Sequence, residues 1–361
     1  FSQDSEGNLI AGGGAGAAAD SDTCFNIMLG CSSGAALNSG DHNVLLGHSA
    51  GNAMTSGRCN VAIGVYAMSD GTVTGARNVA IGKHAGRCTT SGSDNIRIGL
   101  EAGQHTTDSS ANINIGRETG KYSTGGTNVI IGCGSASKSG FSGSGTIAIG
   151  HKAAACAVMT GDNNILLGCN TGCNISSGAC NVAIGRGAIG AATHTGSKNI
   201  AIGCLAMANA TSGLCNIAIG VEAMKDDVTG QFNVVIGDQA GKSLTSADNN
   251  VFIGRSSASN ATQGDQNIAI GGLAAGSLTC GCYNVFMGWY GGTNVTTGSR
   301  NIMIGCKVCA PSATGNDQLA IGCGTGRWIV GDSSFNVCLA GTAVTMTSGT
   351  TSCVIAHKFC G

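Results

Sequence analysis

The sequence predicts an all-β fold: a parallel β-solenoid (β-roll) of about 20 coils, with 17–18 residues in each coil. A five-residue pattern, typified by Asn60–Gly64 (NVAIG), recurs twenty times between Asn8 and Asn336. Of the nineteen intervals, twelve are 17 residues long, six are 18 and one is 16. With 62 Gly, one Pro and 4% aromatic residues, the chain suits a thin core rather than a thick globular one. A fixed period of this length indicates one repeat array instead of several globular domains.

Each repeat is predicted to form one coil of the solenoid. Taking the Asn position as 0, position +1 is Val, Ile or Leu and position +3 is Ile, Leu, Met or Ala in every copy. This alternation and the β-branched residues are typical of a strand. Gly follows at +4 in nineteen copies and permits a bend, and a small residue stands at +7 in nineteen copies, where a second short strand is expected. Segments such as Thr55–Gly57 then supply turn chemistry.

Asparagine occupies position 0 in eighteen copies, although it is a poor strand residue. In a stack of coils these side chains lie above one another, so we expect them to form a hydrogen-bonded ladder along the rod. The predicted ladder consists of Asn26, Asn43, Asn60, Asn78, Asn95, Asn112, Asn128, Asn164, Asn181, Asn199, Asn216, Asn233, Asn250, Asn267, Asn284, Asn301 and Asn336.

Position +2 faces away from +1 and +3, and yet it is Ala in eight copies, with Leu, Ile, Val or Phe among the others. Only Arg97 and Asn114 are plainly polar there. A strand that is apolar on both faces is usually covered on both. We therefore expect an assembly face at position +2, represented by Ala183, Ala201 and Ala218, which another sheet or another copy covers. The alternative is that Ala is tolerated at an exposed surface.

The ends of the chain differ from its middle. The repeat array is assigned to residues 23–343. Residues 1–22 are expected to be an irregular segment, a first coil or an assembly segment, and residues 344–361 a degenerate coil or assembly segment. Neither end shows an evident cap, and uncapped repeat arrays expose strand edges. The ends are therefore expected either to contain a cap or to bind something, such as another copy.

Nineteen cysteines favour an oxidising environment with disulfides. Cys306 and Cys323 share position +5 in adjacent repeats, while Cys156 and Cys173 lie at +10 and +9 of adjacent repeats. Equivalent residues one coil apart should have Cα atoms about 5 Å apart, within the range that a disulfide accepts. We predict both bonds.

Four Asn-x-Ser/Thr sequons begin at position +10 of their repeats: Asn174, Asn209, Asn260 and Asn294. That position starts the predicted turn, so the four side chains are expected on one exposed edge as candidates for N-glycosylation. Because Ser and Thr are common at +12 as turn residues, the sequons can equally be a by-product of turn chemistry.

Composition and motifs argue against several functions. With a net charge of −1 and 10% charged residues, the chain has no basic tract for nucleic acid. No apolar run approaches the ~18 residues of a membrane helix, so no membrane insertion is expected. No nucleophile–base–orienter set is evident, so we expect neither an enzyme nor a catalytic site. Cys306–Cys309 is a lone CxxC, which is a weak metal signal, and no metal or other cofactor is expected.

The repeat Asn-Val-Ala-Ile-Gly-x-x-Ala, followed by Thr-Ser-Gly or Thr-Thr-Gly, resembles the head repeats of trimeric autotransporter adhesins. It is also similar to the Asn-Thr-Ala-x-Gly repeats of phage tail fibres. The resemblance extends from Asn8 to about Ala343. It implies a left-handed parallel β-roll in which three chains associate, with a head that binds host matrix or cells. The longer repeat and the high cysteine content depart from the family pattern.

The sequence thus predicts a structural subunit of an extracellular fibre or filament, a disulfide-reinforced rod that assembles with copies of itself. The alternative is an adhesin or receptor-binding fibre module that presents its turn loops to a cell surface or matrix ligand. A third possibility is an ice-binding solenoid, which needs a flat face of aligned Thr; here the Thr residues fall in turns of varied sequence. The expected location is extracellular, or on a virion or cell surface.

Overall fold

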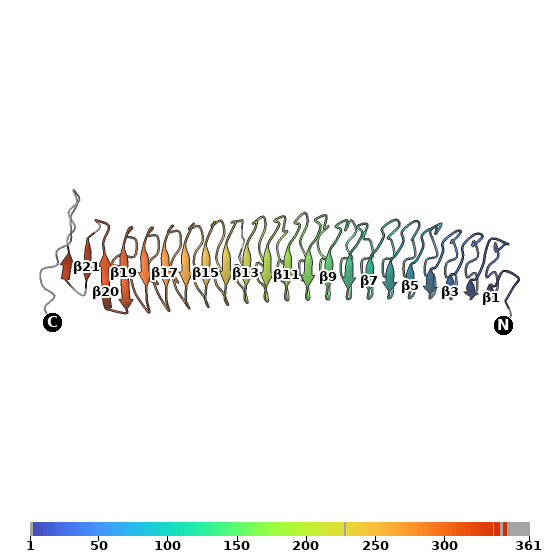
Figure 1. Cartoon of the computed structure of the whole chain (residues 1–361), viewed down its shortest axis with the longest axis horizontal. Helices are drawn as coiled ribbons and strands as arrows, with labels where there is room; N and C mark the ends of the chain where they lie inside the picture. Colours follow the sequence, from blue (N-terminus) through green and yellow to red (C-terminus); the bar gives the residue numbers. More distant parts are fainter. Residues whose placement is uncertain (1–2, 227–228, 335, 340–341, 345–361) are drawn as a thin grey trace.

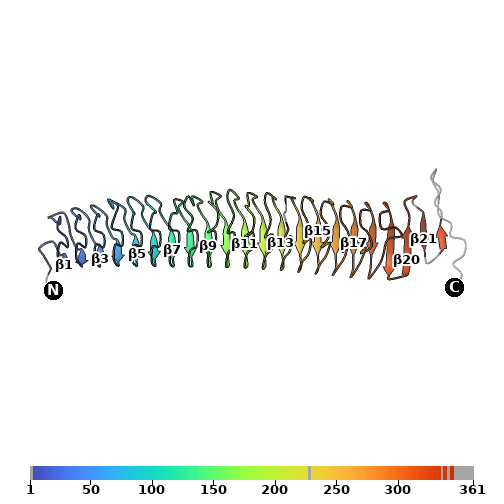
Figure 2. The ribbon, with the colours of Figure 1, turned by 180° about the vertical axis from the view of Figure 1, so that it is seen from behind.

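The computed structural model describes residues 3–226, 229–334, 336–339 and 342–344, which form a long rod with the first described strand at one end and the last at the other (Figure 1). The predicted parallel β-solenoid is confirmed, with about 18 coils rather than 20 and no helix among the described residues. One short strand from each coil aligns along the rod, as the view from behind also shows (Figure 2).

The strands all belong to a single sheet. They are β1 (Leu9–Ala11), β2 (Ile27–Leu29), β3 (Val44–Leu46), β4 (Val61–Ile63), β5 (Val79–Ile81), β6 (Ile96–Ile98), β7 (Ile113–Ile115), β8 (Val129–Ile131), β9 (Ile147–Ile149), β10 (Ile165–Leu167), β11 (Val182–Ile184), β12 (Ile200–Ile202), β13 (Ile217–Ile219), β14 (Val234–Ile236), β15 (Val251–Ile253), β16 (Ile268–Ile270), β17 (Val285–Met287), β18 (Ile302–Ile304), β19 (Leu319–Cys323), β20 (Gly326–Gly331), β21 (Val337–Leu339) and β22 (Thr342–Val344).

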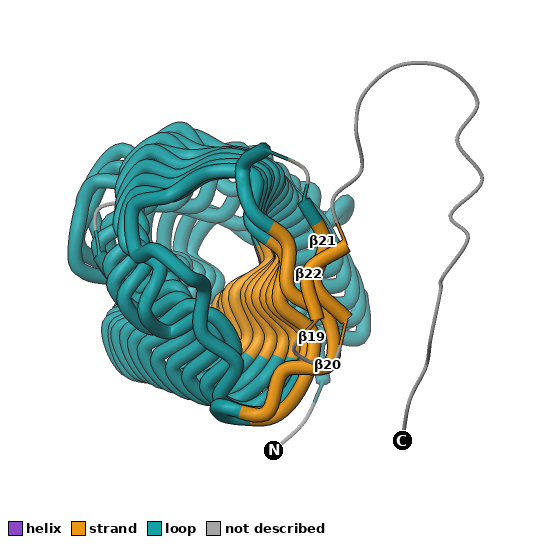
Figure 3. The backbone as a smooth tube through the Cα atoms, turned by 90° about the vertical axis from the view of Figure 1, so that its left-hand side faces the viewer, coloured by secondary structure: helices purple, strands orange, loops and turns teal. Residues whose placement is uncertain are grey.

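Strands β1 to β19 pair in parallel, each with its sequence neighbours, and equivalent repeat positions face one another. Between β12 and β13, for example, Ala201 pairs with Ala218. The expected second strand in each coil does not form: outside the named strands of the described region, only the isolated bridges Met54–Val73 and Ile175–His194 occur. Turns complete each coil, as the view along the rod shows (Figure 3).

Glycine at +4 is required by the backbone rather than merely tolerated. Gly64 has a φ of 130°, and a Cβ placed on it would lie 2.7 Å from the carbonyl oxygen of Gly82 in the next coil. A side chain at this bend would therefore collide with the neighbouring backbone and would also have to adopt a conformation that L-residues rarely take. The strict recurrence of Gly at +4 thus sets where each strand ends.

The structure reverses the expected inner and outer faces of the strands. From β2 to β19 the residue at +2 is buried in the lumen, and the residues at +1 and +3 are partly exposed on the outside. Ala183, Ala201 and Ala218 have no exposed surface, so the predicted assembly face at +2 is wrong. The coil is narrow, and the side chains of its own turns already fill the space that +2 faces.

In some coils, residue size at +2 is matched to residue size at +8. A Cβ on Gly51 would lie 2.9 Å from Leu45, and Gly292 lies against Phe286 in the same way, whereas Ala62 shares its coil with the larger, buried Met68. Other coils share the space with their neighbour: a Cβ on Gly241 would lie 3.2 Å from Phe252 of the next coil. The lumen is thus filled by side chains from the same coil and from the next one, at the close packing expected of protein interiors.

The C-terminal end of the solenoid leaves the parallel pattern. β19 pairs antiparallel with β20, β20 with β21 and β21 with β22. The expected coil at Asn336 is therefore wrong, because β21 runs antiparallel to its neighbours. These strands pair the last edge of the parallel sheet, which is the function of a cap. At the N-terminal end, residues 8–19 form a first coil. Of the predicted C-terminal segment, residues 345–361 lie outside the described residues.

Candidate functional site

The asparagine ladder is present and buried along the rod. At a typical rung, the backbone N–H of Asn233 donates to Oδ1 of Asn216 over 2.9 Å, and Asn233 Nδ2 donates to the same oxygen over 3.0 Å. Nδ2 also donates to the carbonyl oxygen of Ala247, in the turn that leads into the next strand, over 2.7 Å. Each amide therefore satisfies a buried backbone donor and ties strand to turn, which explains why asparagine holds this position.

Membership of the ladder differs from the prediction at its ends. Asn8 belongs to it, since Asn26 donates to its Oδ1, and Gln318 belongs to it by donating to Asn301. The inclusion of Asn336 is wrong, because this residue bonds to Asp332 within its own turn. The reason is the antiparallel course of β20, which places Asn336 away from the stack.

Thr146 interrupts the ladder between Asn128 and Asn164. Its backbone N–H donates to Asn128 over 2.8 Å, as at other rungs, but its Oγ1 is buried without a partner. The Nδ2 of Asn164 instead donates to Gly161, in the turn just before it, over 3.1 Å. If position 146 were asparagine, its side-chain Nδ2 would donate to the carbonyl oxygen of Gly161, as the asparagines of other rungs do at the equivalent turn. One rung is thus missing its side-chain link.

An apolar stripe follows the outside of the sheet along the whole rod. We define the outer sheet face as the +1 and +3 residues of β1–β19, from Leu9 and Ala11 to Leu319 and Ile321. Each of these residues is Val, Ile, Leu, Met or Ala, and each is partly or fully exposed. Exposed apolar patches that extend well beyond scattered single residues mark interaction surfaces.

Charged residues stand just before and just after the strands. Arg77 and Asp94, which precede neighbouring strands, form a bidentate ion pair with distances of 2.6 and 2.9 Å. After β13, Glu222 accepts from Lys225 and Lys242 at 2.8 and 2.9 Å, and these lysines lower the pKa of Glu222 to about 2. The apolar stripe thus has polar borders, as protein interfaces do.

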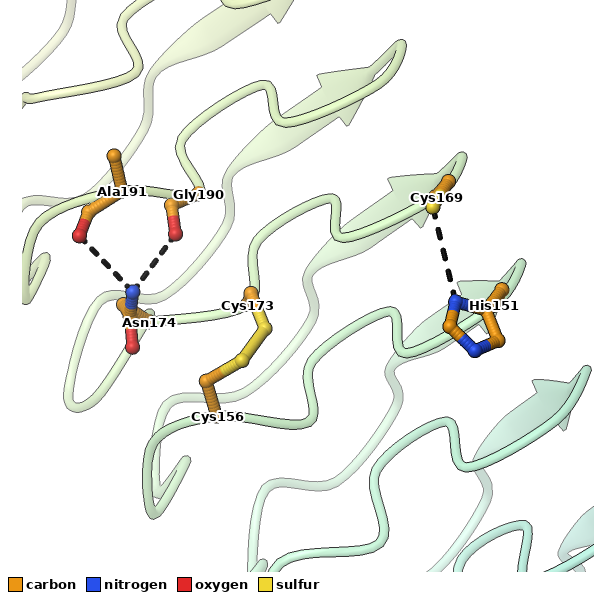
Figure 4. Close-up of a disulfide and its surroundings, with 7 residues drawn as sticks. All are labelled: His151, Cys156, Cys169, Cys173, Asn174, Gly190 and Ala191. Atoms are coloured by element: carbon orange, nitrogen blue, oxygen red, sulfur yellow. Dashed lines mark hydrogen bonds between the residues drawn. A yellow bond between two sulfur atoms is a disulfide. The ribbon is translucent and has the colours of Figure 1, made fainter.

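One of the two predicted disulfides is present. Cys156 and Cys173 are bonded between adjacent coils, with their Cα atoms 4.9 Å apart (Figure 4). The predicted bond between Cys306 and Cys323 is wrong, since both are free thiols. The register of β19 shifts at Gly322, and the chain then turns into β20, so Cys323 leaves the path on which it would stack over Cys306.

The sequon asparagines start their turns as predicted, but only Asn260 is fully exposed. Asn174, Asn209 and Asn294 are half-buried, so the expectation that all four project into solvent is wrong for these three. The amide nitrogen of Asn174 donates to the carbonyl oxygens of Gly190 and Ala191 in the next coil over 2.8 and 3.1 Å (Figure 4). Asn260 and Asn294 donate to the next coil in the same manner. Glycosylation itself stays a prediction.

Catalytic and metal chemistry find little support in the side-chain arrangement. Among the described residues, no group of three or more His, Cys, Asp or Glu is placed to hold a metal ion. Cys88 Sγ lies 3.6 Å from His105 Nδ1, but burial raises the pKa of Cys88 and so favours the less nucleophilic thiol. Among the residues that the structure describes, no helix is long and apolar enough to span a membrane.

The chain was also compared with known proteins. No protein-family model matches it, and no curated protein matches it. Fold and site geometry therefore carry the functional argument. The sequence predicted a surface at +2, whereas the exposed apolar residues of the strands lie at +1 and +3.

Proposed function

We propose that the chain is a structural rod, the subunit of an extracellular fibre, which associates side by side with copies of itself through the outer sheet face. The observation that supports this most is the uninterrupted apolar stripe from β1 to β19. Partly exposed apolar side chains in every strand would be a liability on an isolated rod, because apolar surface is driven out of water. Side-by-side association of rods would bury this stripe along its whole length.

A second copy is the partner that best fits such a stripe. Its side chains repeat once per strand, at about 4.8 Å, over nineteen strands. Another stripe of the same length and period can interdigitate with it at every rung, whereas a partner of different period would match only locally. Two sheets that pack face to face in this way lie about 10 Å apart.

The available area is adequate for a stable association. Nineteen strands at ~4.8 Å give a stripe about 85 Å long, and three residues per strand give a width of about 10 Å. Two copies would then bury on the order of 850 Å² each, which corresponds to a standard protein interface. The ladder inside each rod and the polar borders beside the stripe would keep the two faces in register.

The test replaces part of the outer sheet face by charge. We expect the triple variant I200K/I217K/V234K, which changes three consecutive +1 residues, to be monomeric by sedimentation velocity while the unchanged protein is oligomeric. The matched control is T195K/S212K/T229K, which adds the same charge at exposed turn positions and should assemble like the unchanged protein. An unchanged protein that remains monomeric at its highest soluble concentration would rule the proposal out.

A further inference from the structure

Five free cysteines form one row along a border of the outer sheet face. They occupy position +5, two residues beyond the ends of their strands, and none of them is buried. We call them the cysteine row: Cys31 after β2, Cys133 after β8, Cys169 after β10, Cys204 after β12 and Cys306 after β18. Figure 4 shows Cys169 near the end of its strand and apart from the disulfide in the adjoining turn.

The cysteine row is symmetric about its centre. β10 is the middle strand of the nineteen strands β1–β19 that pair in parallel. Cys133 and Cys204 lie two strands to either side of it, and Cys31 and Cys306 lie eight strands to either side. Cys323 also stands at +5, but it lies within β19 and pairs with β20, so it has left the row. The row therefore has the same order from either end of the rod.

This symmetry matches a twofold axis perpendicular to the rod. An antiparallel copy that overlaps the rod completely places β1 opposite β19 and β10 opposite β10, with +5 opposite +5 at every strand. Cys169 then faces the partner's Cys169, and Cys133 faces the partner's Cys204. By the same relation, Cys31 faces the partner's Cys306. Each cysteine of the row is thus opposite another cysteine.

A parallel copy would not match the cysteines in this way. Rotation about the rod axis places −1 opposite +5 of the same coil. Free cysteines occupy −1 at Cys59, Cys180 and Cys215, and none of these three coils has cysteine at +5. In the antiparallel pair, Lys83 and Arg255 are the one like-charged pair that meets across the +5 positions. Both are exposed and long, so they can turn apart into solvent.

Basic side chains stand beside the three central cysteines of the row. Arg117 Nη2 donates to Cys133 Sγ over 3.4 Å, and an arginine one coil earlier donates to Cys204 Sγ over 3.3 Å. His151 Nδ1 lies 3.8 Å from Cys169 Sγ (Figure 4). Partly exposed cysteines beside arginine or histidine are the type that reacts in thiol–disulfide exchange.

We propose that two antiparallel copies are joined along the cysteine row by interchain disulfides, one at Cys169, two between Cys133 and Cys204, and two between Cys31 and Cys306. The inference rests on the proposed self-association through the outer sheet face, which brings the two rows together. A disulfide needs Cα atoms about 4.4–6.8 Å apart, whereas facing sheets lie about 10 Å apart. The two rods are therefore inclined, with their closest approach along the row.

Each bond forms by exchange with a low-molecular-weight disulfide. The thiolate of one cysteine attacks that disulfide, forms a mixed disulfide and releases one small thiol. The thiolate of the partner's cysteine then attacks the protein sulfur of the mixed disulfide and releases the second small thiol. Two cysteine thiols are oxidised and lose their protons, and one small disulfide is reduced to two thiols.

The first test maps the links in the unchanged protein. The protein is treated with oxidised glutathione, the remaining thiols are blocked, and linked peptides are identified by mass spectrometry without reduction. We expect links of Cys133 to Cys204, of Cys31 to Cys306 and of Cys169 to itself, the last in a mixture of isotope-labelled and unlabelled chains. Within one rod, Cys133 and Cys204 are four strands apart, about 19 Å, so a link between them joins two copies.

Variants that keep one cysteine of the row separate this pairing from random oxidation. C31S/C133S/C204S/C306S keeps Cys169 and should still be linked through it as a dimer. C31S/C169S/C204S/C306S keeps Cys133 and should lose every link at that residue, because its mate is absent. Mixing this variant with C31S/C133S/C169S/C306S, which keeps Cys204, should restore the link between the two.

Sedimentation velocity in reducing buffer tests the proposed function separately from the links. An oligomer in reducing buffer that gives none of the expected links on oxidation would overturn this inference and leave the proposed function standing. Links of Cys133 to itself, or of a −1 cysteine to a +5 cysteine, would also overturn it. A protein that is monomeric in reducing buffer and still forms the expected links would support the antiparallel pairing and reject association through the outer sheet face.

Discussion

Replacing Thr146 by asparagine should close the gap in the asparagine ladder and stabilise the coils on either side. Thr146 Oγ1 has no partner, and Asn164 donates to Gly161 instead of to a side chain one coil earlier. In the T146N variant, the new Oδ1 would accept from the backbone N–H and Nδ2 of Asn164, as Asn164 Oδ1 does from Asn181 at 3.0 and 3.2 Å. The new Nδ2 would then donate to Gly161.

The expected magnitude follows from counting these bonds. T146N adds three hydrogen bonds, and one of them, to Gly161, replaces the bond that Asn164 now donates to the same carbonyl. The net gain is therefore about two buried hydrogen bonds. At about 1 kcal/mol for each, T146N should raise the free energy of local opening by about 2 kcal/mol. That corresponds to about 30-fold slower hydrogen exchange, since 1.4 kcal/mol is a factor of ten.

Hydrogen exchange of the peptide that contains Asn164 is the appropriate assay, because a long repeat array need not unfold in one step. The matched control is N181T, which creates an equivalent gap two coils further along and should speed exchange at Asn199 by a similar factor. If T146N leaves the exchange at Asn164 unchanged while N181T speeds exchange at Asn199, the ladder bonds do not account for the stability at Thr146.

Three further predictions concern other features of the coil. Thr127 is a β-branched residue with a φ of 58°, so T127N should raise the free energy of local opening by about 1 kcal/mol as read by hydrogen exchange, and N163T should lower it. Glu222 has its pKa lowered to about 2, so its ion pairs stabilise the fold above pH 4.5 and are lost as the pH falls towards 2; E222Q should remove that part of the pH dependence of the melting temperature. The variant C156S/C173S should lose about 3 kcal/mol, and reduction of the unchanged protein should reproduce the loss in exchange measurements.

The coil, its in-register stacking and the ladder were predictable because all three follow from the period of the sequence. A repeat of 17 or 18 residues with Gly at +4 leaves few other ways to stack strands. The end of the solenoid was not predicted, because Asn336, Val337 and Leu339 match the first positions of the repeat. The available signal was the residue at +4, which is Ala340 in that copy and Gly in the others.

The orientation of the strands was not predictable from alternation, because both faces are apolar. Ala218 at +2 lies inside and Ile217 at +1 outside, whereas hydrophobicity alone favours the reverse arrangement. In this coil the lumen holds Ala218 together with Met224, both fully buried, while the larger Ile217 and Ile219 lie outside. Arg97 was recognisable as an exception at +2, but its burial follows only once that face is known to be internal.

The asparagine at position 0 makes neighbouring repeats interchangeable along the ladder. Each such asparagine offers its neighbours the same donors and acceptors as the one it joins. Where the size match also lies within one repeat, as for Phe286 and Gly292, a duplicated copy brings that match with it. Recombination between such repeats can therefore lengthen or shorten the rod in steps of about 4.8 Å. Repeats that interlock, as Gly241 does with Phe252 of the next coil, would have to be gained or lost together with their neighbour.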